Sequence, residues 1–409
     1  MDSKSFDIIL FGATSFVGKI ATRYFLNEIG LNNQVKWAIA GRCEKKLQQL
    51  KQSLGENAAD LHLIVADCAD PNSLNHLCRH TRVILSTVGP YALYGEPLIK
   101  ACVENGTDYC DLTGEAYWIK LMLDKYQHKA QRSGARIINC CGFDSIPSDL
   151  GVYCLQKAAQ QQYNQPLQHI KLRVKAIKGG VSGGTVASAI AMFTTAQKDP
   201  QMRRTMGNPY LLCPEELSYS TPQPRIKGPV YDSDFNSWSA PFVMETINRP
   251  VVLRSHALRS TKANNQLIYG EAVLTGKGTK GYLRACSVTL GLVCFAIGLK
   301  IKPLRYLMHK FLLPKPGSGP SEQQQLHGFF DIRLIGLKDN QQIGIKVLGD
   351  RDPGYGCTAK MLVQAGLCMA FDINKNELQG GLWTPSTAMG DRLIQRLNQS
   401  AGMSFQIQH

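Results

Sequence analysis

A glycine-rich turn near the start of the chain has the spacing of a dinucleotide-binding site. The segment Gly12-Ala13-Thr14-Ser15-Phe16-Val17-Gly18 follows an apolar run at residues 6–11 and precedes a helical pattern. Gly12 permits a tight turn, Gly18 lets the helix pack on the strand, and the helix N-terminus offers free N–H groups to a pyrophosphate. Ser15 replaces the usual middle glycine with a small hydroxyl that can bond phosphate. We favour a nucleotide site over a tight turn without a ligand.

The residues after the next two predicted strands indicate which nucleotide. The strand at 35–40 ends in Gly41-Arg42, where an NAD-binding fold would place an acid for the ribose hydroxyl. Arg42 can instead fork onto a 2′-phosphate, so we predict NADP in preference to NAD. A solvated loop arginine is the alternative, and a flavin stays open. Asp67, after the strand at 61–65, lies near the adenine or at the start of the next helix.

Hydride transfer needs little from the protein beyond orientation, and reduction of a double bond or a carbonyl needs a proton donor or a polarising group as well. The loop Val88-Gly89-Pro90 follows the strand at 83–87 and is predicted to hold the nicotinamide and its ribose. Acidic and phenolic groups follow the ends of predicted strands, and the candidates for catalysis are Tyr91, Asp111, Glu115 and Asp144. Of these we select Tyr91 and Asp144, although Asp144 also suits a helix cap.

Two other patterns are weaker. Tyr153 and Lys157 match the Tyr-x-x-x-Lys pair of short-chain dehydrogenases. The chain has 15 tyrosines, so about one such match is expected by chance. His76 and His80 have metal-ligand spacing, but no acid or cysteine nearby completes a site. We therefore predict no metal and treat Tyr153 as an accidental match.

The elements that must position these residues alternate between strand and helix. Further strands are predicted at about 107–109 and 136–139, with helices at 96–105 and 115–133. Such alternation over 140 residues predicts an α/β fold with a Rossmann-type, doubly wound parallel sheet. We assign residues 1–160 to this NAD(P)-binding domain.

Several short motifs occur in a shared order along the chain. Besides the glycine turn and Ala40-Gly41-Arg42, they are residues 86–91, 109–115, 142–149, 314–321, 349–356 and 380–385. Together they resemble the saccharopine dehydrogenase-like oxidoreductase family, and its lipid-associated branch with the trans-acting enoyl reductases. The resemblance covers nearly the whole chain. It implies a nucleotide-binding oxidoreductase with a role near lipids, and it leaves the substrate open.

The second half is predicted to be an α+β domain, residues 161–384, for substrate binding and dimer contact. Strands are expected at 265–275, 328–337 and 342–349. The glycine-rich segment 179–185 is either an anion cradle or a hinge, and residues 208–241 form a long loop that suits a lid. The segment 385–409 is expected to pack back on the first domain.

A basic and apolar block lies within this second half. Residues 272–321 contain no Asp or Glu and eight Lys or Arg, while residues 285–298 are almost wholly apolar. A run of 10–14 apolar residues more often forms a buried or interfacial helix than a bilayer span. For a helix at 283–313 we favour monotopic contact with an anionic membrane over a buried or dimer helix, and a true span comes last. Nucleic acid is not expected, because the cations adjoin an apolar run.

Composition agrees with this interpretation. The 409 residues carry a net charge of +15, and 13 cysteines include no C-x-x-C pair. The charge favours an anionic partner, and the cysteines favour a reducing intracellular compartment without a zinc ribbon or disulfide scaffold. We expect an NADP-dependent oxidoreductase that acts on a lipid-linked or apolar substrate. We place it at a membrane surface, or otherwise in the cytoplasm, and a homodimer is compatible with the sequence. The alternatives are a lipid-surface nucleotide-binding protein without turnover and a soluble amino-acid dehydrogenase.

Overall fold

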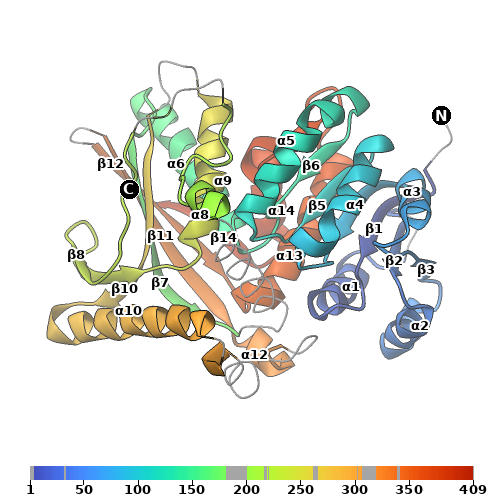
Figure 1. Cartoon of the computed structure of the whole chain (residues 1–409), viewed down its shortest axis with the longest axis horizontal. Coiled ribbons are helices and arrows are strands. Elements are labelled where there is room, and N and C mark those ends of the chain that lie inside the picture. The colour runs from blue at the N-terminus through green and yellow to red at the C-terminus, as the bar shows by residue number, and fades with distance from the viewer. Residues whose placement is uncertain are drawn as a thin grey trace. The chain divides into compact units, whose positions relative to one another are not determined.

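The chain is divided between two compact units. The computed structural model describes residues 4–31, 34–180, 200–215, 219, 221–260, 266–301, 303–305, 319–338 and 341–408. One unit comprises Met1–Ile146 and Gly354–Gly402, and the other comprises Pro147–Pro353 and Met403–His409 (Figure 1). The division therefore lies at the start of the helix α6 (Ile146–Tyr163), which the sequence-based range 1–160 had placed in the first domain. It does so because α6 packs on the sheet of the second unit, where Gly151 lies against Leu334.

The first unit is built on a seven-stranded sheet. Its strands are β1 (Phe6–Phe11), β2 (Trp37–Gly41), β3 (His62–Val65), β4 (Thr81–Ser86), β5 (Asp108–Asp111), β6 (Arg136–Ile138) and β13 (Gly381–Trp383). The order is β13-β6-β5-β4-β1-β2-β3, and every pair is parallel. Ile8, Ile9 and Leu10 of the central β1 are fully buried, as expected for a strand covered on both faces. The prediction of a doubly wound parallel sheet is confirmed.

Helices flank this sheet in the order that strand–helix alternation predicts. They are α1 (Phe16–Glu28), α2 (Glu44–Ser53), η1 (Glu56–Ala58), α3 (Pro71–Arg79), α4 (Tyr91–Glu104), α5 (Ala116–Ser133), α13 (Thr358–Leu367), η4 (Cys368–Asp372) and α14 (Pro385–Ser400). The short element η3 (Pro353–Cys357) precedes α13. The predicted helix at 96–105 begins earlier, at Tyr91, because the carboxylate of Glu115 caps its first amides.

The C-terminal segment is shared between the units. β13 adds a parallel edge strand to β6, and the following α14 buries Met389, Leu393 and Leu397 in the first unit. The chain then forms β14 (Met403–Gln408), which pairs with the second unit's sheet. Only the helical part of residues 385–409 therefore belongs with the first unit.

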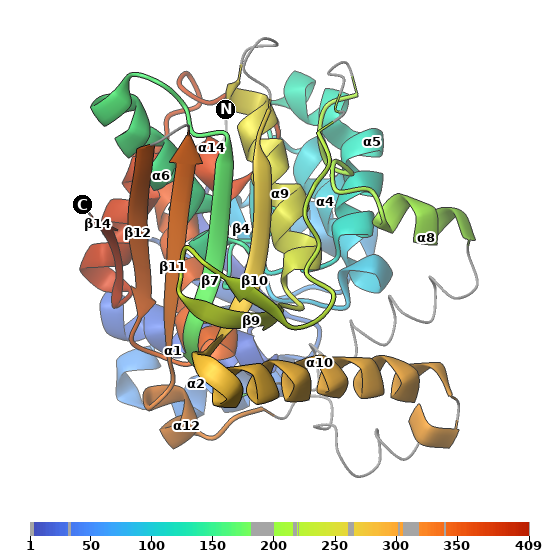
Figure 2. The same ribbon diagram turned by 90° about the vertical axis from the view of Figure 1, so that its left-hand side faces the viewer.

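The second unit contains a mixed sheet of its own. Its elements are α6, β7 (His169–Lys178), α8 (Pro200–Met206), β8 (Val230–Asp232), β9 (Ser237–Pro241), α9 (Glu245–Arg259), β10 (Ile268–Gly276), α10 (Gly278–Lys300), α12 (Glu322–Leu326), β11 (Phe329–Lys338), β12 (Gln341–Gly349) and β14. The order is β14-β12-β11-β7-β10-β9-β8, with only β7 and β10 parallel among its paired strands (Figure 2). The three predicted strands appear as β10, β11 and β12. The predicted loop 208–241 includes two short strands, β8 and β9.

A buried ion pair joins the strands of the first unit to its C-terminal return. The Arg136 guanidinium pairs with Asp108, and both side chains are almost fully buried. Its Nε donates to Oδ2 of Asp108 at 3.0 Å, and its other N–H groups donate to the carbonyl oxygens of Ile373 at 2.8 Å and Met369 at 3.1 Å. The pair therefore fixes β5 and β6 to the segment that follows α13.

We expect Arg136→Met to destabilise the protein by about 3–5 kcal/mol, because it leaves the Asp108 carboxylate buried without its cation. Chemical denaturation measures the free energy of unfolding. The double variant Asp108→Leu/Arg136→Met should recover much of the loss, whereas the exposed Arg79→Met should change little. A single Arg136 variant as stable as the parent would show that the pair does not hold this junction.

Candidate functional site

The glycine turn between β1 and α1 is closed against the end of β4. Gly12 has φ +87°, and a β-carbon there would lie 2.7 Å from Cγ2 of Val88 and 2.8 Å from Oγ1 of Thr87. A β-carbon at Gly18 would lie 2.3 Å from the carbonyl oxygen of Gly12. Side chains are therefore excluded at both positions, as a turn that lets backbone approach a ligand requires.

Ser15 is the N-cap of α1. Its hydroxyl accepts a hydrogen bond from the amide of Gly18 at 2.9 Å and lies 3.0 Å from the hydroxyl of Thr87. This leaves the amides of Phe16 and Val17, the first two of the helix, without an acceptor among the described residues. Two free amides beside a small hydroxyl fit a phosphate group, and Ala13 and Thr14 complete the turn.

Arg42 and Asp67 follow the ends of neighbouring parallel strands. Gly41 pairs with Val65, and the amide of Ala66 donates to the carbonyl oxygen of Gly41 at 3.1 Å. The Arg42 side chain is exposed and forms no ion pair with any residue that the structure describes. The Asp67 carboxylate accepts from the amide of Ala69 at 3.0 Å, so it begins the turn that leads into α3. An exposed cation at the end of β2 fits a ribose 2′-phosphate.

The loop after β4 leads directly into α4. Val88 lies against the glycine turn, and the peptide bond between Gly89 and Pro90 is cis. Tyr91 then begins α4 and is buried. Its hydroxyl donates to the carbonyl oxygen of Ser86 at 3.0 Å and accepts from the amide of Leu112 at 3.1 Å. Burial, helped by the charge of Asp111, raises the pKa of Tyr91 well above its usual range.

The two other candidate acids have positions that explain their burial. Glu115 accepts hydrogen bonds from the amides of Tyr91 at 2.9 Å and Ala92 at 2.8 Å. Asp111 receives four hydrogen bonds, from the amides of Thr113 and Cys140, the Asn139 side chain and the Tyr109 hydroxyl. Burial raises the pKa of Asp111 to about 6 against the effect of these donors. Both acids therefore hold strand-end loops in place.

Asp144 differs from these acids. It lies in the loop after β6, partly exposed, with its carboxyl carbon 3.7 Å from the point where a β-carbon on Gly114 would lie. Its carboxylate has no hydrogen-bond donor among the residues that the structure describes. Burial, followed by the charge of Asp111, raises the pKa of Asp144 to about 7. A carboxyl group that holds its proton near neutral pH can act as a general acid.

Sequence reasoning missed some residues that shape this edge of the sheet. Thr87 donates to the carbonyl oxygen of Gly12 at 2.9 Å and so connects the ends of β1 and β4. Thr358 accepts from the amide of Phe143 at 3.0 Å, beside Asp144. Thr87 stood within a motif that the sequence analysis quoted. Thr358 is 215 positions from Phe143, and no local signal points to it.

The two weaker sequence patterns, Tyr153 with Lys157 and His76 with His80, lie outside the proposed cofactor site. Tyr153 lies on α6 in the second unit, where the Arg259 guanidinium is 4.2 Å from its ring centre. The rings of His76 and His80 are 4.2 Å apart at the end of α3. No group of three possible metal ligands occurs within the described ranges. Of the glycine-rich segment 179–185, only Gly179 and Gly180 lie within the described residues.

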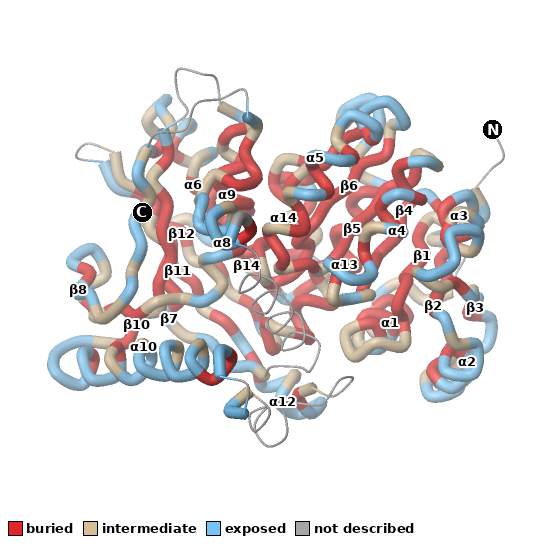
Figure 3. Tube along the Cα trace, in the orientation of Figure 1, coloured by how far each residue is buried: buried red, intermediate tan, exposed pale blue. Residues whose placement is uncertain are grey.

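The predicted basic and apolar helix corresponds to α10, with residues 302 and 306–313 outside the described part. Its first turn is docked, since Gly281 packs on Gly276 and the rings of Tyr282 and Trp238 are 4.8 Å apart. Beyond Ala285 the helix is largely exposed (Figure 3), and Leu283 and Leu290 are 62% and 63% exposed. By length and composition α10 is the one described helix that meets the criteria for a candidate membrane span.

Comparisons with known proteins agree with the dinucleotide site. The family described as "Saccharopine dehydrogenase NADP binding domain" matches residues 8–138. The trans-acting enoyl reductase of Mycobacterium tuberculosis is 35% identical over 404 residues, which are 96% of each chain. That of Mycobacterium leprae is 34% identical over 413 residues, covering 98% of this chain and 97% of its own. Apo saccharopine dehydrogenase (L-Glu forming) from Saccharomyces cerevisiae shares the fold, with TM-score 0.52 and 12% identity over 98% of this chain and 99% of its own.

We expect Arg42→Ala to weaken NADPH binding roughly ten- to a hundredfold and to leave NADH binding nearly unchanged, because only NADPH carries the 2′-phosphate. Fluorescence titration of both cofactors measures the two dissociation constants. Arg132→Ala, an exposed arginine in the last turn of α5, is the matched control. Equal weakening of both cofactors would remove Arg42 from the phosphate site.

Proposed function

The chain belongs to the saccharopine dehydrogenase-like oxidoreductases, and on that premise we propose that it reduces the double bond of a lipid-linked enoyl substrate at an anionic membrane surface. Its cofactor is NADP. The observation that carries the choice of reaction is Asp144, a half-buried residue whose carboxyl group has a pKa raised to about 7 by burial, at the edge of the sheet where the cofactor turn lies. The names of the full-length relatives support the same chemistry.

The reaction combines a hydride with a proton. NADPH, when bound by the glycine turn and Arg42, would supply the hydride for one carbon of the double bond and be oxidised to NADP⁺. Asp144 in its neutral form donates its proton to the other carbon, so the double bond becomes a single bond with one new hydrogen on each carbon. The resulting carboxylate regains a proton from solvent before the next turnover.

In this proposal Tyr91 positions the loops of the site and does not transfer a proton. Its hydroxyl holds Leu112 and Ser86 together, and its amide holds Glu115, so it connects the loop after β4 to the loop after β5. Its raised pKa and its backbone partners make it a poor source of protons compared with Asp144. It therefore fixes the nicotinamide loop to the loop after β5, where Gly114 lies against Asp144.

The cofactor residues divide the dinucleotide among three loops. The turn from Gly12 to Gly18 holds the pyrophosphate, with amides of Phe16 and Val17 as donors. Arg42 binds the 2′-phosphate, and Asp67 lies beside the adenine. Val88, Gly89 and Pro90 hold the nicotinamide ribose. These assignments follow from the edge of the parallel sheet at which each loop lies.

The site of action is supported by α10. The helix exposes apolar side chains along its length, and the segment from residue 272 to 321 contains cations without acids. Lys277, Lys280, Arg284 and Lys300 are exposed at or near its two ends. Apolar side chains flanked by cations complement the interface of an anionic bilayer, where lysine stems reach the headgroups. A lipid-linked substrate would be met at that surface.

We expect Asp144→Asn to lower the rate of NADPH oxidation by about a hundredfold or more with an active enoyl thioester or enone lipid, because the proton donor is removed. The wild-type rate should fall as pH rises through about 7, where the Asp144 carboxyl loses its proton. Asp60→Asn, an exposed acid, is the control. An Asp144 variant with the wild-type rate and pH profile would contradict the role.

The same variant tests the raised pKa of Asp144 through protein stability, without any enzyme assay. The folded-state pKa of Asp144, about 7, exceeds the unfolded value of about 3.9. The folded protein therefore binds more protons between these pH values, so this group's contribution to stability declines as pH rises through the window. Asp144→Asn should gain stability relative to wild type from pH 5 to pH 8, as measured by thermal unfolding. A constant difference would contradict the raised pKa.

We expect Leu283→Gln/Leu290→Gln to weaken binding to anionic vesicles by tenfold or more, since each leucine contributes roughly 1.5–3 kcal/mol when buried in lipid. Co-sedimentation at low and high salt measures binding, which should also weaken with salt. Leu93→Gln, a leucine of equal exposure on α4, is the matched control. Absence of vesicle binding by the wild type would contradict the membrane proposal; a concentration-dependent dimer lost in the double variant would then assign α10 to a second copy.

The two other hypotheses are outcomes of these tests. NADPH binding and vesicle binding without oxidation of any enoyl or enone substrate would favour a nucleotide-binding lipid-surface protein. Activity on an amino acid in place of an enoyl lipid would favour a soluble dehydrogenase.

A further inference from the structure

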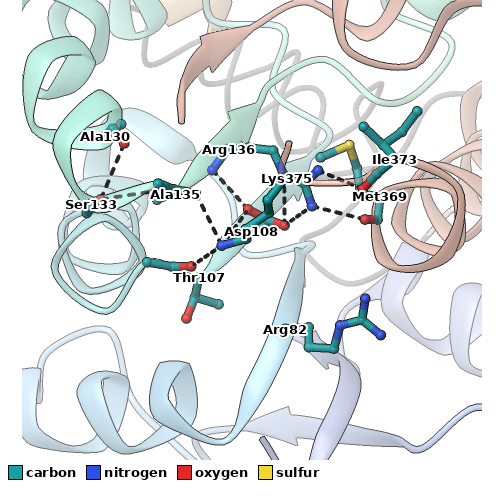
Figure 4. Close-up of polar contacts among 12 residues, drawn as sticks. Arg82, Thr107, Asp108, Ala130, Ser133, Ala135, Arg136, Met369, Ile373 and Lys375 are labelled. Carbon is teal, nitrogen blue, oxygen red and sulfur yellow. Dashed lines mark hydrogen bonds and ion pairs between the residues drawn. The ribbon is translucent and has the colours of Figure 1, made fainter. Parts of the chain in front are cut away.

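The first unit contains a cavity at the amino ends of its parallel strands, whereas the cofactor turn lies at their carboxyl ends. The cavity has a volume of about 560 Å³ and is lined by residues at the amino ends of β4, β5 and β6 and by residues 369–375 and 377. Figure 4 shows the polar contacts of Asp108 and Arg136 beside Lys375. The glycine turn, the loop after β4 and Asp144 all follow carboxyl ends of strands. The cavity is therefore separate from the proposed reaction site, and its volume lies in the range of small-molecule pockets.

Cations outnumber acids along one wall of this cavity. Lys4 Nζ donates to the hydroxyl of Thr107 at 2.8 Å. Lys375 Nζ donates to the carbonyl oxygen of Gly106 at 2.8 Å and lies 3.8 Å from Oδ1 of Asp108. Asp108 is already paired with Arg136. This carboxylate is therefore shared between Arg136 and Lys375, and Lys4 has no acidic partner among the described contacts, so the two lysines carry a positive excess.

The remaining acids of the cavity do not offset this excess. Asp372 Oδ1 accepts from Arg396 at 2.8 Å, and Glu377 Oε2 lies 2.9 Å from Arg392. Both of these arginines lie outside the cavity lining. The pKa of Lys4 is lowered by burial and next by the charge of Lys375, which indicates that the two ammonium groups repel each other. An anion between them would relieve that repulsion.

Apolar side chains also line the cavity. Phe371 is 43% exposed, and the Arg82 guanidinium lies 5.5 Å from its ring centre. Ile373 and Met369 also line the cavity. Arg82 is paired with Asp7 at 3.0 Å, so the two lysines are the cations left for a ligand. Together with the exposed ring of Phe371 they fit a ligand that carries an anionic group on a carbon skeleton.

We propose that this cavity binds a small organic phosphate, with the phosphate between Lys4 and Lys375 and the carbon skeleton against Phe371. Phosphate suits this wall because a phosphate monoester carries about two negative charges near neutral pH, and lysine binds phosphate as a point charge. The Lys4 ammonium group has three N–H donors, of which the described contacts use one. Lys375 donates to the carbonyl oxygens of Gly106 and Gly134, so it contributes mainly its charge. The site goes beyond the proposed function, since no residue of it takes part in hydride or proton transfer.

Titration calorimetry with inorganic pyrophosphate tests the site. The protein is first saturated with NADPH, so that the glycine turn and Arg42 are already occupied. We expect one binding event, weakened roughly tenfold in Lys4→Gln and in Lys375→Gln, because each removes one charged contact. Lys100→Gln, an exposed lysine on α4, should bind like the wild type. No binding, or equal binding by all variants, would overturn the proposal.

A second measurement uses the unaltered protein. Lysine acetylation by a water-soluble reagent, mapped by mass spectrometry, reports the rate at Lys4 and at Lys100. Pyrophosphate should slow acetylation of Lys4 severalfold, since a bound phosphate keeps the amine protonated and covers it, and Lys100 should react as before. An unchanged rate at Lys4 would overturn the proposal even if the substituted proteins did not fold.

Discussion

The buried carboxylate of Asp111 holds the edge of the sheet on which the proposed chemistry depends. It receives hydrogen bonds from the loops after β5 and β6, through Thr113, Asn139 and Cys140, and from Tyr109 of its own strand. These donors keep a charged group in an apolar setting and fix the loop after β6 relative to the loop after β5. The same charge contributes to the raised pKa of Asp144. One structural acid therefore both positions a second acid and helps it to retain a proton.

Different positive groups lie at the two ends of the parallel strands. At the carboxyl ends, glycine turns and free helix amides gather where phosphates of a dinucleotide fit. At the amino ends, Lys375 donates to the carbonyl oxygens of Gly106 and Gly134, just after α4 and α5, where the helix dipole favours cations, and Lys4 donates to the Thr107 hydroxyl. Backbone amides can therefore attract an anion at the carboxyl ends of the strands, and ammonium groups can do so at the amino ends.

The apolar side chains of the two units are used differently. In the first unit they form the buried core around β1, whereas α10 of the second unit leaves its leucines exposed. Amino-acid composition alone does not distinguish the buried apolar side chains of the first unit from the exposed ones of α10. An exposed apolar helix is costly in water unless something covers it, and its flanking cations are the feature that favours an anionic lipid surface as that cover.

Local signals determined much of this protein. The apolar runs, the glycines at 12 and 18 and the residue types after each strand predicted the parallel sheet, the cofactor turn and NADP, because each depends on a few consecutive residues. Tertiary structure alone decided the rest. It brought Thr358 to the loop of Asp144, placed β13 beside β6, and gathered Lys4, Asp108 and Lys375 around one cavity. Contacts between residues hundreds of positions apart, and the burial that shifts a pKa, arise only when the chain has folded and leave no periodic or spaced pattern in the sequence.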